Sequence, residues 1–427
     1  MAQRRGFRQY LAGLLAPRDR SKTLTCLAGA EPVTGAGLPA VQRLQFFLSG
    51  SVWKPEAVNA RRLELLLADP LTAPHGGGVL VIDDSGDRKD GSATAHVGRQ
   101  WLGRIGKAGN GVVTVTTAWV DERVYYPVHA GPYTPARHFA KGKNDPAFRT
   151  KLKIAADMAV QARASGLAFR AVAADSAYGD QDNFRAELSE AGLPFVMALK
   201  PSRGTWAYGP EAHTPADAAR GLLWGTEQEP GDWQPVTRAF RDGHTEDWRA
   251  ADATLGWWGP DGPRRIVVAT TDPGTLPDKA TWYLVTNLPR PGGPREAEGP
   301  WPAASLEEIV RIYGLRHWVE QSYKQVKDEL GRADFQVRSD IAIRRHQALV
   351  NCAFSFCWLT ARPPPRPAPA SPAERGCRRP TPPATRDHDS HGDTNLAPHA
   401  ARHPQLANPG HHAHALVDIM VQSAPAP

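Results

Sequence analysis

Apolar positions recur at helical spacing through the first 70 residues of the chain. The pattern is clear between Tyr10 and Leu15 and again between Val41 and Leu48. Side chains at this spacing share one face of an amphipathic helix. We therefore expect residues 1–70 to form several short helices, with basic residues on their solvated faces.

Near residue 76 the pattern changes to short apolar and β-branched runs separated by turns, which predict strands. The expected strands are 78–82, 111–120, 123–128, 169–174 and 194–199. Helical spacing predicts one helix from Asp145 to Ser165, with Asp145-Pro146 as its cap and first turn, and another over 183–191. The order β-β-β-α-β-α-β indicates an α/β fold.

Residues 201–300 break this rhythm and are rich in Gly, Pro and Trp. Clear strands are expected only at 265–271 and 281–286, so the segment is typical of an inserted, mostly β module. Its tryptophans are Trp206, Trp224, Trp233, Trp248, Trp257, Trp258 and Trp282. Helical spacing returns at 305–330 and 341–359. The segment 362–427 holds 14 of the 39 prolines and little apolar periodicity, which predicts a disordered tail.

Composition narrows the function classes. Lys+Arg 51 against Asp+Glu 44 gives a net charge of +7, which favours polyanionic partners. The four cysteines match no zinc or redox spacing, and no run reaches the roughly 18 apolar residues of a membrane span. We expect a soluble cytoplasmic protein with reduced thiols and no membrane partner.

Two carboxylates follow buried strands. Asp83 ends the first strand, beside Asp84, and Asp175 ends the fourth. Taken alone, each is more often a strand-terminating turn residue or a helix cap than a functional residue.

A third feature lies within the helix predicted for 305–330. At about 100° per residue, Tyr313, Arg316, Glu320 and Lys327 fall within a sector of roughly 60°. One stripe then presents a phenol, a guanidinium, a carboxylate and an ammonium group. Mixed charges on a solvated helix face are the alternative interpretation of the same stripe.

The spacing Tyr-x2-Arg-x3-Glu-x6-Lys resembles the signature of bacterial insertion-sequence transposases of the DDE type. The segment 81–86 is similar to the first aspartate motif of that family, with Ser85 where Thr is usual, and 174–179 is similar to the second. The resemblance covers residues 10–360, but the tail after Arg362 is unlike the usual family C-terminus.

The resemblance implies an RNase H-like core built on a mixed five-stranded sheet. The implied domains are a helical DNA-binding domain at 1–70, the first part of the core at 71–200, the β-rich insertion at 201–300, the rest of the core at 301–361 and the tail at 362–427. Basic helices in the first domain are similar to those that read terminal inverted repeats.

The same resemblance implies a catalytic site of Asp83, Asp175 and Glu320 that holds two Mg²⁺ ions, for which Mn²⁺ substitutes. The adjacent Asp84 leaves the first ligand open; Asp83 is preferred because the family places its aspartate first in the Asp-x-Thr/Ser triplet. The residues implied to contact DNA are Tyr313, Arg316, Lys327 and Lys324. A tryptophan of the insertion is implied to stack on a flipped base.

The implied function is that of a transposase that cleaves DNA at the ends of its element and joins the 3′-OH to target DNA. Its partners would be double-stranded DNA and a second copy of the chain, in the bacterial cytoplasm and on the nucleoid. Two alternatives stay open. One is an RNase H-like nuclease that only hydrolyses nucleic acid, and the other is a decayed relative that binds DNA without chemistry.

Overall fold

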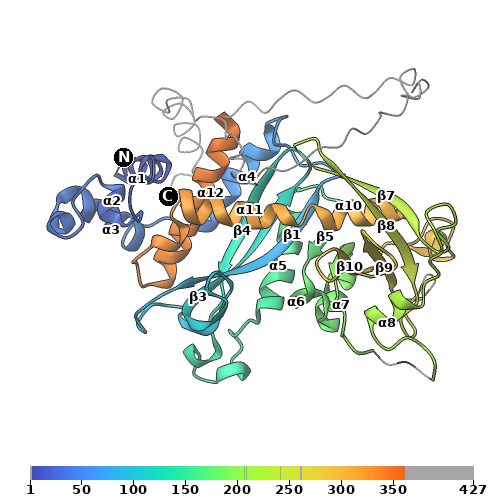
Figure 1. Cartoon of the computed structure of the whole chain (residues 1–427). Helices are drawn as coiled ribbons and strands as arrows, with labels where there is room; N and C mark the ends of the chain where they lie inside the picture. Colours follow the sequence, from blue (N-terminus) through green and yellow to red (C-terminus); the bar gives the residue numbers. More distant parts are fainter. Residues whose placement is uncertain (1, 206, 208, 241, 260–261, 361–427) are drawn as a thin grey trace, which may run out of the picture.

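A computed structural model describes residues 2–360 except 206, 208, 241, 260 and 261 (Figure 1). The predicted tail at 362–427 and Trp206 lie outside the described residues. In the described part of the chain, no helix combines the length and the apolar character that a membrane crossing needs.

The N-terminal residues form helices, as predicted. These are α1 (Ala2–Leu15), α2 (Leu24–Leu27), α3 (Pro39–Ser49) and α4 (Pro55–Ala68). Of these, α1, α3 and α4 pack against α12 (Asp340–Thr360), and α2 packs on α1 and α3. Their buried side chains join the same apolar core as the sheet. Arg345 of α12 is buried and donates hydrogen bonds to the carbonyls of Leu48, Ser51 and Trp53. The first and last described segments therefore pack as one cluster beside the sheet.

The α/β fold expected from the sequence is confirmed, and its centre is a mixed sheet. Its first six strands are β1 (Val79–Arg88), β2 (Gly98–Leu102), β3 (Lys107–Val120), β4 (Tyr125–Pro132), β5 (Ala171–Ala174) and β6 (Phe195–Ala198). The five predicted strands lie side by side in the order β4-β3-β1-β5-β6, with β1, β5 and β6 parallel. This arrangement is consistent with an RNase H-like core. The unpredicted β2 pairs with the start of β3.

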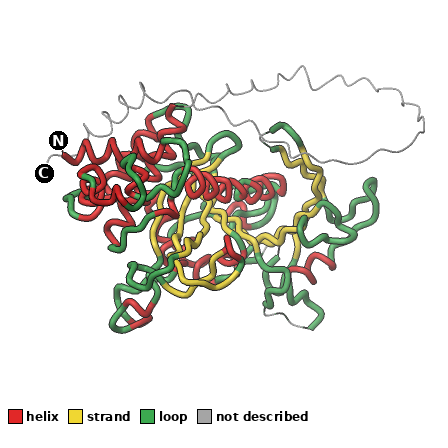
Figure 2. The backbone as a smooth tube through the Cα atoms, turned by 60° about the vertical axis from the view of Figure 1, so that its left-hand side comes forward, coloured by secondary structure: helices red, strands yellow, loops and turns green. Residues whose placement is uncertain are grey.

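The segment 201–300 continues this sheet. Its strands are β7 (Gln234–Ala239), β8 (Thr245–Ala253), β9 (Arg265–Thr270) and β10 (Thr281–Thr286), and its short helices are α8 (Pro215–Arg220) and α9 (Arg295–Glu298). β10 pairs antiparallel with β6, so the whole sheet has ten strands. In Figure 1 the N-terminal helices lie near one end of the sheet and the insertion strands lie at the other. Figure 2 shows the helices near the N-terminus gathered at one end of the molecule.

Helices cover both faces of the sheet. Those of the central segment are α5 (Lys151–Ala164), α6 (Ser176–Gly179) and α7 (Asp182–Glu190). The predicted start of the first of these at Asp145 is wrong. Thr150 caps α5 by accepting a hydrogen bond from the Lys153 N–H, whereas Asp145 closes a turn by accepting one from the Ala147 N–H.

The single helix predicted for 305–330 is also wrong. The segment forms α10 (Leu306–Gly314), α11 (His317–Lys324) and a π-helical turn (Gln325–Glu329). At the junction the Trp318 and Val319 N–H groups bond to carbonyls three residues back, the pattern of a tighter helix. Gly314 weakens the helix at this point because glycine is a poor helix former. We call residues 306–330 the glutamate segment.

Candidate active site

The pairing of β1 with β5 brings the two predicted aspartates together. Val79 lies opposite Ala171 and Val81 opposite Ala173 in this parallel ladder. Continuing the same register by two residues places Asp83 opposite Asp175. Asp175 then caps α6, where its Oδ1 accepts a hydrogen bond of 3.0 Å from the Ala177 N–H.

The electrostatics of Asp83 reflect this proximity. Burial raises the pKa of its carboxyl to about 7, and the neighbouring Asp175 adds to the shift. Both effects disfavour the charged form, because a buried carboxylate loses hydration and a second carboxylate repels it. A cation held between the two side chains would relieve both.

Arg316 links Asp83 to Glu320. Its Nη1 lies 3.6 Å from Asp83 Oδ2, and its Nη2 donates a hydrogen bond of 3.1 Å to Glu320 Oε1. The Glu320 side chain is 63% exposed, whereas that of Asp83 is 18% exposed. The three predicted acids therefore share one region, but the guanidinium of Arg316 separates Glu320 from Asp83. Among the described residues, no three His, Cys, Asp or Glu side chains lie close enough together to hold a metal ion.

Asp84 faces a different element. Its Oδ2 lies 3.0 Å from Nζ of Lys151, at the start of α5. Successive side chains of a strand point to opposite faces of the sheet, so Asp83 and Asp84 cannot both face the glutamate segment. The side chain that faces Arg316 is that of Asp83, the residue preferred from the sequence.

The residues predicted to contact DNA differ in their surroundings. Burial raises the pKa of Tyr313, whose ring packs edge-on against Trp282 with centroids 5.0 Å apart. Lys324 is exposed. Lys327 is buried, and its Nζ lies 2.8 Å from Asp87 Oδ1. The predicted stripe is therefore divided between the surface and the interior.

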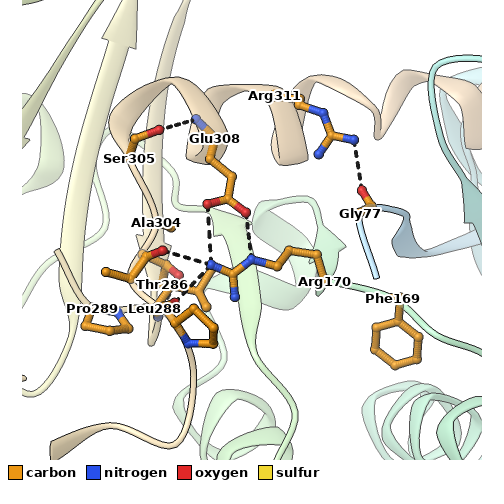
Figure 3. Close-up of polar contacts among 12 residues, drawn as sticks. Gly77, Phe169, Arg170, Thr286, Leu288, Pro289, Ala304, Ser305, Glu308 and Arg311 are labelled. Atoms are coloured by element: carbon orange, nitrogen blue, oxygen red, sulfur yellow. Dashed lines mark hydrogen bonds and ion pairs between the residues drawn. The ribbon is translucent and has the colours of Figure 1, made fainter. Parts of the chain in front are cut away.

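Polar contacts fix the start of the glutamate segment on the sheet (Figure 3). Arg170, just before β5, donates a hydrogen bond of 2.6 Å to Glu308 Oε1. Arg311 donates one of 2.8 Å to the carbonyl of Gly77, just before β1. The strands that carry Asp83 and Asp175 thus bind α10 at their beginnings.

The insertion reaches the same helix. The Arg238 guanidinium lies over the rings of Trp248 and Trp282, 4.8 and 4.5 Å from their centroids. Trp282 in turn contacts Tyr313. Of the predicted tryptophans, these two place aromatic surface beside the end of α10.

Comparison with known proteins identifies the family. A model of the DDE superfamily endonucleases matches residues 1–254. The chain belongs to this family. It is also 32% identical over 302 residues to the probable transposase for insertion sequence element IS701 of Microchaete diplosiphon, which covers 70% of each chain.

The match to the DDE endonucleases includes Asp83 and Asp175 and ends before Glu320. Members of this superfamily use divalent metal ions, and an oxygen-only donor set is what Mg²⁺ prefers. Asp83 and Asp175 fit such an ion because they are adjacent, partly desolvated carboxylates. Glu320 fits as a third donor once its side chain leaves Arg316.

Three residues that contact the candidate site or its supporting strand were not predicted from the sequence. They are Lys151, which pairs with Asp84, Arg332, whose Nη2 donates to Ser85 Oγ, and Asp87, which pairs with Lys327. Asp87 lies four residues after Asp83 on the same strand. Because side chains alternate between the two faces of a strand, the sequence could have indicated that both face the same way. Lys151 and Arg332 gave no comparable signal, since their partners are distant in sequence.

Proposed function

We propose that this chain is the transposase of an insertion sequence. It binds the terminal inverted repeats, cleaves DNA at the element ends and joins the freed 3′-OH to target DNA. The observation that carries the proposal is the β1–β5 register, which sets Asp83 against Asp175 while Arg316 holds Glu320 nearby. The similarity to the IS701 relative supports the reaction class.

In this proposal Asp83, Asp175 and Glu320 hold two Mg²⁺ ions, for which Mn²⁺ can substitute. Bound in pairs, such ions activate the attacking oxygen and stabilise the leaving oxygen of a phosphodiester. Arg316 binds a backbone phosphate, because a guanidinium presents paired donors that match phosphate oxygens. A phosphate that takes this guanidinium leaves the Asp83 and Glu320 carboxylates available to metal.

DNA binding involves several surfaces. Lys324 adds an exposed positive charge beside Glu320, and Tyr313 donates a hydrogen bond to the same backbone. The basic helices of residues 1–70 read the inverted repeats. A tryptophan of the insertion stacks on a flipped base at the element end. Transposition joins two ends, so the chain acts as a homodimer on double-stranded DNA of the bacterial nucleoid.

A strand-transfer assay tests the proposal. The full chain is incubated with labelled DNA that carries the inverted repeats flanking its gene, a target plasmid and Mg²⁺ or Mn²⁺. Joined products support the proposal. Hydrolysis of unrelated DNA without joining identifies a nuclease, and binding without any cleavage identifies a decayed relative; either result contradicts it.

A further inference from the structure

Alternate side chains of β1 each meet a cationic residue from the glutamate segment or the turn after it. The pairs are Asp83 with Arg316, Ser85 with Arg332 and Asp87 with Lys327. Residues of one parity on a strand share a face of the sheet, so these contacts all lie on one face of β1. Contacts of this kind fix the height and direction at which a helix crosses a strand.

The third pair is the most buried. Asp87 is 3% exposed and Lys327 is 9% exposed. The Lys327 ammonium lies 2.8 Å from Asp87 Oδ1 and donates a hydrogen bond of 3.1 Å to the Gly86 carbonyl. Removing one partner of a buried ion pair leaves an uncompensated charge, which is strongly destabilising.

The π turn accounts for the inward position of Lys327. In an unbroken α-helix, Lys327 would lie at nearly the same azimuth as Glu320, seven residues earlier. Glu320 is instead largely exposed and Lys327 is buried. Arg18 holds this turn from outside by donating hydrogen bonds of 2.6 and 2.7 Å to the carbonyls of Lys327 and Asp328.

The contacts follow the same order along both elements. Arg311 meets Gly77, Arg316 meets Asp83, and Lys327 meets Asp87. The glutamate segment therefore runs along β1 and is fixed before and after Glu320. Arg316 belongs to the site and changes partner in the proposed reaction, so Lys327 is the fixed point on the far side of Glu320.

We propose that the buried Lys327–Asp87 pair sets the position of Glu320 relative to Asp83 and Asp175. Lys327 is a positioning residue, and it does not contact DNA phosphate. This inference rests on the proposed function, and it replaces the DNA-binding role that the sequence resemblance implies for Lys327. The exposed Lys324 keeps that role.

The salt dependence of DNA binding separates the two roles of lysine. Losing one phosphate contact reduces the slope of log K against log salt by about 1. We expect Lys324→Met to show this change and Lys327→Met to keep the slope of the unmodified chain. If Lys327→Met does not fold, the double variant Lys327→Met with Asp87→Leu, which removes both buried charges, provides the same measurement. If Lys327→Met or the double variant reduces the slope by about 1, the inference is overturned.

Asp87→Asn tests positioning from the other side of the pair, because Asp87 is an acid that has no role in holding DNA. Calorimetric titration of the DNA-bound chain with Mn²⁺ should give a dissociation constant raised about 10- to 100-fold, the usual cost of losing a supporting partner. Hydrogen exchange should rise in residues 317–330. The matched control is Asp90→Asn, which removes the exposed ion pair with Arg88 and should change neither readout.

Mn²⁺ binding by Asp87→Asn that equals that of Asp90→Asn overturns the inference. The outcome is independent of strand transfer. A chain that binds Mn²⁺ but joins no DNA contradicts the proposed function and leaves the positioning role measurable.

Discussion

The two sides of the site are held in different ways. On the β1–β5 side, the backbone ladder that pairs residues 79–81 with 171–173 brings Asp83 near Asp175, and burial raises the pKa of Asp83. On the side of the glutamate segment, the helix is interrupted and Glu320 is held through the side chain of Arg316. The aspartates thus belong to the rigid core, and the glutamate belongs to an element fixed by side-chain contacts.

This difference indicates which part of the site can move. A ladder within a buried sheet changes register only with loss of its core packing. An ion pair as exposed as that of Glu320 contributes about 0 to 1 kcal/mol, so exchanging partners costs little. We expect the aspartates to be preset and Glu320 to join them when metal and DNA bind.

The largest expected effect is at the preset side. Asp83→Asn should lower the DNA cleavage rate by about 1,000-fold or more, because a metal ligand contributes several kcal/mol to the transition state. Asp84→Asn is the matched control, since its side chain faces Lys151, and it should lower the rate by less than about 10-fold. Equal losses in the two variants, measured by gel assay, would contradict the assignment of Asp83.

Glu320→Gln should lower cleavage by about 100-fold or more while leaving binding to the element ends nearly unchanged. The amide keeps the size of the side chain but loses the charge that holds a cation. Fluorescence anisotropy measures binding, and Glu307→Gln, at the start of α10, provides the control. Normal cleavage by Glu320→Gln would show that another residue supplies the third carboxylate.

Changing the length of the acids distinguishes the rigid side from the movable one. Asp83→Glu should reduce cleavage about 10-fold more than Glu320→Asp does, because a buried strand position cannot make room for an added methylene. Both variants keep the charge, so single-turnover rates report geometry alone. A greater loss for Glu320→Asp would mean that the glutamate side is the more constrained one.

The smallest effect concerns the anchor of α10. Arg170→Met should lower the free energy of unfolding by about 2 kcal/mol, because Glu308 and the carbonyls of Pro302 and Ala303 lose a charged donor. Arg220→Met removes an exposed pair with Asp217 and should leave the denaturation midpoint unchanged. Equal midpoints for the two variants would contradict the anchoring role of Arg170.

The sequence predicted the core strands because their patterns are local. The run 78–82 is continuously apolar, which is why the start of β1 was predicted. The strand continues to Arg88 because these polar residues pair with β3, and the hydrophobic pattern does not reveal that pairing. The positions of Asp83 and Asp175 after their strands were also visible. Their pairing needed the RNase H-like strand order, which came from the family resemblance.

The unpredicted features depend on tertiary contacts. β7 has a single buried residue, Val236, and its pairing with β8 supplies the hydrogen bonds that its own sequence does not indicate. The break after Gly314 and the π turn at 325–329 override helical spacing. As a result, a stripe calculated for an ideal helix placed Lys327 beside Glu320, whereas Asp87 holds it in the interior.

The most direct test of whether the three acids come together on a metal ion is a crystal structure of the full chain with inverted-repeat DNA and Mn²⁺. Anomalous scattering locates the metal in such a structure. We expect Mn²⁺ in contact with the carboxylates of Asp83, Asp175 and Glu320, with Arg316 on a DNA phosphate. Mn²⁺ bound elsewhere, or Glu320 still paired with Arg316 in the complex, would contradict it.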